Sequence, residues 1–333
     1  MPSKVDTAIL DALGLDPSTS KMVSHGGSGF ASSFKLTGTS TKDGKDRSYF
    51  IKTGTGEAAN IMFEGEHASL NAIHATVPSF CPKSHAHGAL SPAHPNTHFL
   101  ATDFLDLHSS SSGSSSSTTH GTGLSLAAKL AKLHTTPAPP PPGFTRPMFG
   151  FPVPTCCGAT QQDNTFTDSW PAFFADSRLR HVLRQGIREN GPDRELEDAV
   201  ETVASKVVPR LLGSETLRGG VVPVVVHGDL WSGNHGRGRI DGGAVEEVVY
   251  DPAAVYGHSE YELGIMRMFG GFGEAFWSEY GGLVERAEPR GEWEDRVKLY
   301  ELYHHLNHFA LFGGGYRGGA MGIMKRLISK YGA

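Results

Sequence analysis

Two carboxylates and one amide follow strand-like segments of this chain. The apolar run Val224–Val226 stops just before Asp229, Asn234 lies one short loop later, and Asp251 ends the next β-branched run. Carboxylate and amide oxygens suit Mg²⁺, which completes its shell with water and phosphate oxygens. The pattern therefore indicates a magnesium-dependent phosphoryl-transfer site, with Asn234 and Asp251 as the metal ligands.

Phosphoryl transfer also needs a base for the acceptor hydroxyl and a cation for the nucleotide phosphates. Asp229 is the candidate base, because a carboxylate can orient a hydroxyl and take its proton late in the reaction. Lys52 ends the strand-like stretch Phe50–Lys52, from which its ammonium can reach phosphate oxygens. A lysine in that place needs a partner to hold it.

Glu66 is the expected partner of Lys52. It lies on the helical segment that follows the Lys52 strand, whereas Glu64 lies off the apolar stripe of that helix and is the second choice. The stripe that Glu66 shares consists of Phe63, Leu70 and Ile73.

A glycine-rich stretch, His25–Gly29, precedes the Lys52 strand. Its backbone amides could approach phosphate oxygens closely. The candidate nucleotide-binding residues here are Gly26, Gly27, Ser28 and Gly29.

Each of these features has an ordinary interpretation when it is taken alone. Glycine-rich runs are usually turns, Asp251 before Pro252 could form a turn, and Asp229 with Asn234 could cap a loop. The order along the chain, from glycines through Lys, Glu and the Asp–Asn loop to the second Asp, is that of a kinase.

The periodicity predicts an α+β fold. Residues 1–103 are expected to form a small lobe with strands around 25–38, 47–54 and 97–107 and helices at 3–15 and 58–76. Residues 104–333 are expected to form a larger, mainly helical lobe that carries a small β-hairpin.

Composition argues against a nucleic-acid-binding protein and against a membrane-spanning protein. A net charge of −5 gives no basic field for nucleic acid, and the sequence contains no apolar run long enough to span a membrane. Three cysteines, Cys81, Cys156 and Cys157, suit a reducing compartment, so a cytoplasmic protein is expected. A monomer is the favoured state, although the sequence does not reveal the oligomeric state. Residues 108–123 are a Ser/Gly-rich insertion, which we interpret as a lengthened surface loop of unknown role.

Several segments resemble the fructosamine-3-kinase family, also called ketosamine or protein-ribulosamine 3-kinases. The resemblance covers roughly residues 20–315 and is most specific in "VVHGDLWSGN" and "YDPAAVYGHSEYEL". Further matching segments are "FIKTG", "MFEGEHASLNAI", "LAAKLAKLH" and "FGFPVPTCCGATQQDNTFTDSWPAFFADSRLR". The family belongs to the aminoglycoside-phosphotransferase-like group, so the resemblance implies a bilobal protein-kinase-like fold.

The resemblance implies ATP and Mg²⁺ as cofactors and a ketosamine as the acceptor. Family members phosphorylate the C3 hydroxyl of ribuloselysine or fructoselysine, on glycated proteins or on small molecules. The 3-phosphate makes the adduct break down and frees the amine, so the implied role is deglycation and protein repair.

The family's site residues map onto this sequence by position. Asp229 matches the catalytic base, Asn234 and Asp251 the metal ligands, and Lys52 with Glu66 the phosphate-binding ion pair.

Other positions map onto the adenine and sugar sites. The segment Ala101–Leu105, with Asp103, Phe104 and Leu105, matches the hinge that holds adenine through its backbone, and Trp231 matches a sugar-contacting aromatic. In "GHSEYEL", we interpret Glu262 as structural. His258 is left open between a structural and a substrate-binding role, and Glu260 is also open.

Other signals are discounted. His304, His305 and His308 lie on an apolar helical segment without an evident third metal ligand, so packing is favoured for them. Cys156 and Cys157 are expected to be buried as small apolar side chains. Some family members carry a cysteine in the glycine-rich loop, where this chain has none, which argues against a thiol switch there.

Two alternatives stay open at this point. The chain could be a kinase for another small alcohol, such as an aminoglycoside or choline, or a non-catalytic scaffold with a kinase fold. A scaffold would not need Lys52, Asp229, Asn234 and Asp251.

Overall fold

The structure is a computed structural model that describes residues 5–28, 31–108 and 123–332 of the 333-residue chain. The chain divides into two compact units. The first comprises Met1–Leu126 with His235–Asp251, and the second comprises Ala127–Asn234 with Pro252–Ala333. Most of the expected Ser-rich insertion, residues 109–122, lies outside the described residues.

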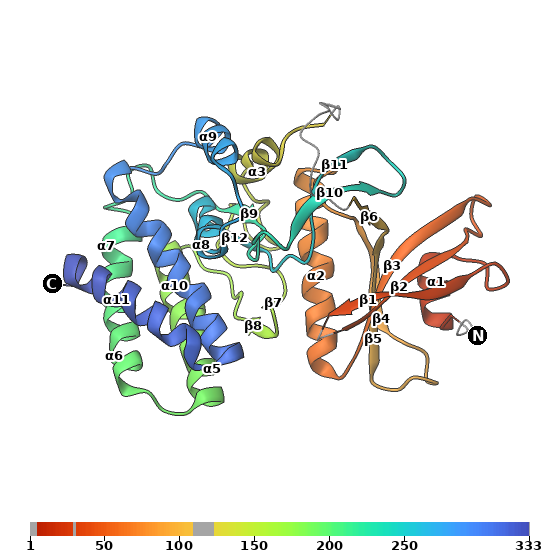
Figure 1. Ribbon diagram of the computed structural model, residues 1–333, viewed down its shortest axis with the longest axis horizontal. Helices are drawn as coiled ribbons and strands as arrows, with labels where there is room; N and C mark the ends of the chain where they lie inside the picture. The colour runs from red at the N-terminus through yellow and green to blue at the C-terminus, as the bar shows by residue number, and fades with distance from the viewer. Residues whose placement is uncertain (1–4, 29–30, 109–122, 333) are drawn as a thin grey trace. The chain divides into compact units, whose positions relative to one another are not determined.

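An antiparallel sheet of five strands forms the framework of the first unit (Figure 1), in the order β1-β2-β3-β5-β4. Residues alternate between its two faces, so Ile51 and Ala101 share one face while Lys52 and Leu100 share the other. The strands are β1 (Lys21–Ser28), β2 (Ala31–Thr39), β3 (Asp46–Thr55), β4 (Ser84–Ala89) and β5 (Thr97–Asp103).

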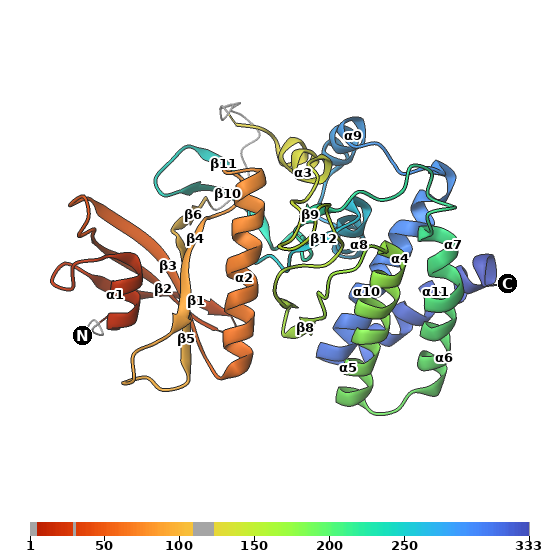
Figure 2. The ribbon, with the colours of Figure 1, turned by 180° about the vertical axis from the view of Figure 1, so that it is seen from behind.

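One helix covers each face of this sheet. The helix α1 (Thr7–Leu13) packs against the face of Ile51, and its first turn is capped by the Asp6 carboxylate, which accepts from the Ala8 amide at 2.9 Å. The helix α2 (Glu57–Thr76) lies along the opposite face (Figure 2), where Phe63 packs on Leu100. This packing places side chains of α2 on the same side of the sheet as Lys52.

A second, three-stranded sheet in the first unit changes the expected lobe boundary. The strand β6 (Leu105–Leu107) pairs with β10 (His235–Ile240), which pairs with β11 (Val245–Val249). The first compact unit therefore extends beyond the boundary expected after residue 103 and includes this hairpin, which was expected in the larger lobe. The reason is a long-range strand pairing, between β6 and β10, that no local pattern signals.

The second unit is mainly helical, as predicted, and Figure 2 shows α5, α6, α7, α10 and α11 gathered in one bundle. A pair of short antiparallel strands, β9 and β12, carries the loop before Asn234. The helices of 4 or more residues are α3 (Leu126–Thr135), α4 (Trp170–Phe173), the π-helical η1 (Phe174–Arg180), α5 (His181–Asn190), α6 (Arg194–Thr202), the π-helical η2 (Val203–Val207), α7 (Val208–Leu212), α8 (Ser259–Phe269), α9 (Glu274–Leu283), α10 (Trp293–Phe312) and α11 (Arg317–Tyr331). The short 3₁₀ turns are η3 (Arg290–Glu292) and η4 (Gly314–Tyr316), and the strands are β7 (Thr155–Cys157), β8 (Thr160–Gln162), β9 (Val224–Val226) and β12 (Val255–Gly257).

An ion pair buried in the second unit joins α8 to α10. The Arg296 guanidinium donates to the Glu260 carboxylate at 2.7 and 3.0 Å and also to the carbonyls of Ala287 and Pro289. The side chains of Arg296 and Glu260 are 0% and 5% exposed. The position of Glu260 is therefore structural, and this settles the role that the sequence left open.

Arg296→Met is expected to lower the free energy of unfolding by about 3–5 kcal/mol, because Glu260 would remain as an unpaired buried charge. Urea denaturation at pH 7 measures this loss. The control is Arg188→Met, which removes an exposed pair with Glu189 and should change stability by less than ~1 kcal/mol. Equal losses of unfolding free energy in the two variants would show that the buried pair contributes no more to stability than the exposed pair.

Candidate functional site

Lys52 is held by two carboxylates within the first unit. Its Nζ lies 2.8 Å from both oxygens of Glu66 and 2.7 Å from Oδ1 of Asp251. Glu66 is placed by α2, which covers the sheet face of Lys52, and Asp251 follows β11. The predicted pair of Lys52 with Glu66 is thus present, and Glu64 is not part of it.

The charge of Lys52 is fixed by this arrangement. Burial alone would lower the pKa of Lys52, but the Glu66 and Asp251 carboxylates raise it above its ordinary value. The lysine is therefore a charged ammonium at neutral pH, and 16% of its side chain is exposed. A cation of this kind can bind the oxygens of a phosphate.

Asp251 has an uncommon backbone conformation. Its φ is +55°, in the left-handed region that Asp tolerates better than most residues, and Pro252 follows it. About half of its side chain is exposed, and Oδ2 takes no part in the bond to Lys52. That oxygen could therefore serve as a ligand for a hard cation.

In the second unit, the loop after β9 makes a turn that requires glycine. Gly228 has φ +81°, and a Cβ there would lie 2.1 Å from the Ala253 carbonyl oxygen. The Ala253 amide in turn donates to the His227 carbonyl at 2.9 Å. The close contact of Gly228 with Ala253, together with this hydrogen bond, fixes the backbone just before Asp229.

Glu262, on α8, holds the same loop from inside the unit. Its carboxylate accepts from the backbone amides of His227 and Gly228, the latter at 3.0 Å, and no part of its side chain is exposed. The Nε2 atom of His134 lies 3.7 Å from it, and the His134 Nδ1 atom lies 2.7 Å from the Tyr280 hydroxyl. The structural interpretation of Glu262 is confirmed. Its role is to hold the backbone of the loop at His227 and Gly228, not only to begin a helix.

The pKa of Glu262 reflects these contacts. Burial alone would raise it, but the neighbouring His134, the His227 side chain and the amide bonds outweigh burial and lower it. Glu262 therefore stays ionised inside the unit.

Asp229 is oriented by contacts to both of its carboxylate oxygens. The Asn234 side-chain amide donates to Oδ2 at 3.2 Å and to the Asp229 carbonyl at 2.9 Å. The Cys157 thiol donates to Oδ1, with 3.7 Å between sulfur and oxygen. Because the amide nitrogen of Asn234 faces Asp229, its Oδ1 is the atom that could bind a metal.

Cys156 and Cys157 were both predicted to be buried; Cys157 is buried, whereas Cys156 is only partly buried. Its β7–β8 hairpin is fixed to α10, since Asn307 donates to the Cys157 carbonyl at 3.2 Å and Gln162 donates to the Tyr303 hydroxyl at 2.7 Å. Burial, and then the Asp229 carboxylate, raise the pKa of Cys157 well above its ordinary value, so it stays a thiol that can donate. The sequence did not reveal its contact with Asp229.

The two predicted acceptor-binding residues have different surroundings. Trp231 is 39% exposed and packs against Phe269 with ring centroids 5.9 Å apart. His258, by contrast, is buried, and its Nδ1 lies 2.8 Å from the Tyr300 hydroxyl. A side chain enclosed in this way is not placed to meet an acceptor, so assigning His258 to the substrate is corrected to a structural role.

The glycine-rich stretch lies at the end of β1. Gly26, Gly27 and Ser28 belong to that strand, which contains a bulge between Ser24 and Gly27 and pairs with β2. Gly29 lies outside the described residues.

The segment 103–105 is partly engaged by the rest of the first unit. The Asp103 amide donates to the Lys83 carbonyl at 2.9 Å, and the Phe104 carbonyl accepts from the Asp241 amide at 3.1 Å. Leu105 pairs with Ile240 in the second sheet.

Among the described residues, no group of three or more His, Cys, Asp and Glu side chains could hold a metal. His304 is fully buried, and the His308 Nδ1 lies 2.8 Å from the His304 carbonyl, so both pack as predicted. In the same ranges, none of the helices is both long and apolar enough to cross a bilayer.

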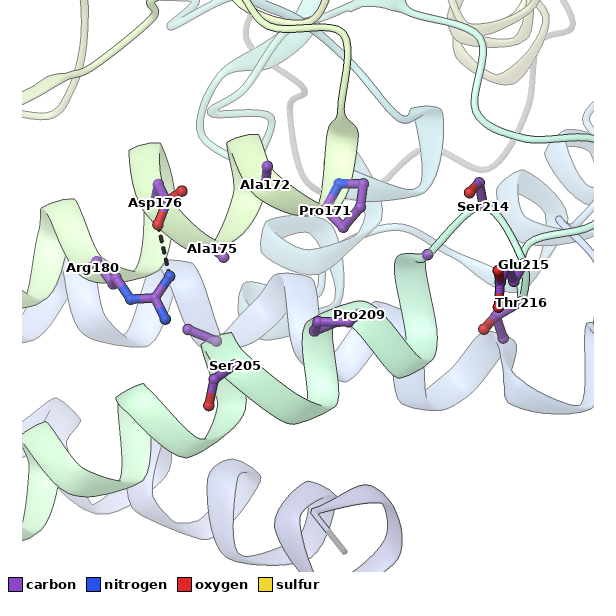
Figure 3. Close-up of a pocket in the computed structure, with 12 residues that line it drawn as sticks. Pro171, Ala172, Ala175, Asp176, Arg180, Ser205, Pro209, Ser214, Glu215 and Thr216 are labelled. Atoms are coloured by element: carbon purple, nitrogen blue, oxygen red, sulfur yellow. Dashed lines mark hydrogen bonds and ion pairs between the residues drawn. The ribbon is translucent and has the colours of Figure 1, made fainter.

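An open depression of about 540 Å³ lies elsewhere in the second unit (Figure 3). It is lined by η1, η2 and the turn after α7, and Arg180 at its edge is paired with Asp176 at 2.6 Å and with Glu201. None of the residues that the sequence singled out for chemistry lines it.

Comparison with known proteins covers nearly the whole chain. Residues 16–330 match the family model described as fructosamine kinase. Ketosamine-3-kinase of Mus musculus is 33% identical over 318 residues, which are 93% of this chain and 96% of the mouse protein. The chloroplastic protein-ribulosamine 3-kinase of Arabidopsis thaliana is 33% identical over 277 residues, 83% of this chain and 75% of the plant protein.

A solved structure shares the fold. The crystal structure of a Thermobifida fusca protein, described as a candidate fructosamine-3-kinase, superposes with a TM-score of 0.70 at 23% identity and covers 98% of both chains. The predicted α+β fold is confirmed, and this solved structure shares it.

Glu262→Gln is expected to lower the free energy of unfolding by roughly 2–3 kcal/mol at pH 7, because charged hydrogen bonds to two buried amides are weakened. The folded-state pKa of Glu262 is lowered, so its contribution is complete above the unfolded value of about 4.3 and disappears as the pH falls through the folded value. The gap between wild type and variant should therefore narrow below about pH 4.

Urea denaturation at pH 7 and at lower pH measures this gap. The control is Glu285→Gln, which alters a side chain that is 91% exposed and should be neutral at both pH values. A gap that is independent of pH would mean that the charge of Glu262 does not hold the loop.

Proposed function

The chain belongs to the fructosamine kinase family, and on that premise we propose that it transfers the γ-phosphoryl group of ATP to the C3 hydroxyl of a ketosamine. One observation carries the proposal. A chain related over 93% of its length to a ketosamine-3-kinase also holds Asp229 between a thiol and an amide on a loop anchored by Glu262. A carboxylate placed so firmly suits a base that must orient one hydroxyl.

Asp229 acts as the base in this proposal. The contacts from Cys157 and Asn234 fix the plane of its carboxylate, so one oxygen can accept a hydrogen bond from the C3 hydroxyl. The hydroxyl oxygen attacks the γ-phosphorus, the bond from that phosphorus to the β,γ-bridging oxygen breaks, and the hydroxyl proton passes to Asp229. ADP and the 3-phosphorylated ketosamine are the products.

Lys52 binds the nucleotide phosphates. Its ammonium, kept charged by Glu66 and Asp251, offsets the negative charge that spreads over the phosphate oxygens during transfer. The glycines of β1, Gly26 and Gly27, would supply amides to the phosphates, and the backbone of residues 103–105 would hold adenine.

Asn234 and Asp251 would hold Mg²⁺. The donor set fits, because the Asn234 Oδ1 and Asp251 Oδ2 are hard oxygens not used in the bonds to Asp229 and Lys52. When bound, magnesium supplies neutralisation of phosphate charge.

The acceptor is a ketosamine on a lysine side chain, formed when ribose or glucose glycates the amine. The exposed face of Trp231, two positions after Asp229, suits the apolar face of a sugar. Phosphorylation at C3 labilises the adduct, which then releases the amine, so the activity serves protein repair.

Asp229→Asn is expected to lower kcat at least about a hundredfold, because an amide cannot accept the hydroxyl proton. ATP binding should remain within about twofold of wild type, since Lys52 and Glu66 are untouched. ADP release with a ribuloselysine peptide measures kcat, and a fluorescent ATP analogue measures binding. Asp168→Asn, which changes an exposed carboxylate, is the control. Near-normal turnover in Asp229→Asn would remove it from the base role, and wild-type turnover of choline or an aminoglycoside alone would replace the proposed substrate.

Cys157→Ala is expected to lower kcat severalfold with KM for ATP unchanged, because a hydrogen bond of about 1 kcal/mol to Asp229 is lost. Cys157→Ser should recover most of the rate, since a hydroxyl can donate in place of the thiol. Cys156→Ala is the matched control one residue away and should behave as wild type. If Ser and Ala variants lose equal activity, the thiol acts through packing only.

A further inference from the structure

Aromatic side chains continue from the loop of Asp229 across the surface of the second unit. They are Trp231, Phe269, His308, Phe312 and Tyr316, which we name the aromatic row. Successive ring centroids lie 5.9, 5.1 and 5.6 Å apart from Trp231 to Phe312, and Phe312 is 6.2 Å from Tyr316. The row joins three helical elements, because Phe269 ends α8, Phe312 ends α10 and Tyr316 lies in η4.

The row is exposed and also firmly held. Trp231 and Phe269 are each 39% exposed and Phe312 is 63% exposed, although large apolar side chains are usually covered. A Cβ at Gly233 would lie 2.1 Å from the Trp231 ring, so glycine there lets the ring lie flat on the loop. His308 packs between Phe269, Phe312 and Tyr316 and fills the middle of the row.

The row carries no charge at neutral pH. Burial lowers the pKa of His308, so the imidazole is neutral, and the other four members are aromatic without an ionised group. Single exposed aromatic residues are ordinary, but a contiguous set marks a surface that binds something apolar. Rigid aromatic side chains also lose little conformational entropy when they are covered.

We propose that the aromatic row is the docking surface for the polypeptide that carries the ketosamine. This inference rests on the proposed function. A lysine side chain has only four methylenes, so a sugar whose C3 hydroxyl meets Asp229 brings the peptide backbone onto the surface beside Trp231. The residues that flank the glycated lysine must then cover what adjoins Trp231, and that surface is the row.

The partner is therefore an extended segment with apolar or aromatic residues near its glycated lysine. Trp231 and Phe269 border the adduct, while Phe312 and Tyr316 receive the flanking side chains. A free ketosamine amino acid is too short to extend along the row to Phe312, which is separated from Trp231 by Phe269 and His308. The row thus favours protein-bound over free ketosamines.

Phe312→Ser tests the proposal, because its target is 63% exposed and the change should not disturb folding. Three acceptors are compared: free ribuloselysine, a ribuloselysine peptide with leucine on both sides, and the same peptide with serine on both sides. Phe312→Ser should lower kcat/KM about tenfold for the leucine peptide, the loss expected for an interface aromatic. It should leave the free amino acid and the serine peptide within about twofold. Leu283→Ser, a similar loss of an exposed apolar side chain on α9, is the control and should leave all three acceptors unchanged.

Each other outcome overturns the docking role. Equal losses with all three acceptors, or no loss with the leucine peptide, would show that Phe312 does not recognise flanking residues. Unchanged kinetics together with a dimer that Phe312→Ser dissociates, seen by sedimentation velocity, would make the row a contact between copies of this chain. If wild-type protein phosphorylates none of the acceptors, the proposed function fails first, and the docking role falls with it.

Discussion

The second unit depends on one buried carboxylate, Glu262. Water cannot reach it, so its charge must be satisfied by protein groups, and those groups are the amides of His227 and Gly228. The loop cannot shift without leaving that charge and two amide donors unpaired. The bonds from Glu262 thus hold the backbone at the start of the loop that carries Asp229. The contacts from Cys157 and Asn234 then orient the Asp229 carboxylate.

In the first unit, the buried charge is a cation, the ammonium of Lys52. Lys52 is largely buried yet stays charged because two carboxylates surround its ammonium. One of them, Glu66, comes from the helix on the same sheet face, while Asp251 comes from far along the chain. The carboxylates of Glu66 and Asp251 therefore fix both the position and the charge of the Lys52 ammonium.

Much of the fold and part of the candidate site followed from local sequence patterns. The strand alternation around Lys52 and the helical stripe that includes Glu66 predict that the two side chains meet. Both the two-residue strand period and the 3.6-residue helix period can be read from a few neighbouring residues. The mainly helical character of the second unit followed in the same way. Local pattern failed where distant segments meet, as when β6 pairs with β10 or when the Cys157 thiol reaches Asp229. It also left the role of His258 open, because a buried and an exposed histidine look the same in a sequence.

In the proposed reaction, the chain phosphorylates one hydroxyl of a ketosamine, the one on C3. The most direct measurement is the position of the phosphate on the product, read by ³¹P–¹H correlation NMR after wild-type protein acts on ribuloselysine with ATP and Mg²⁺. We expect coupling of the phosphorus to the proton on C3, followed by loss of the adduct and appearance of free lysine. A phosphate on another carbon, or a stable product that releases no lysine, would contradict it.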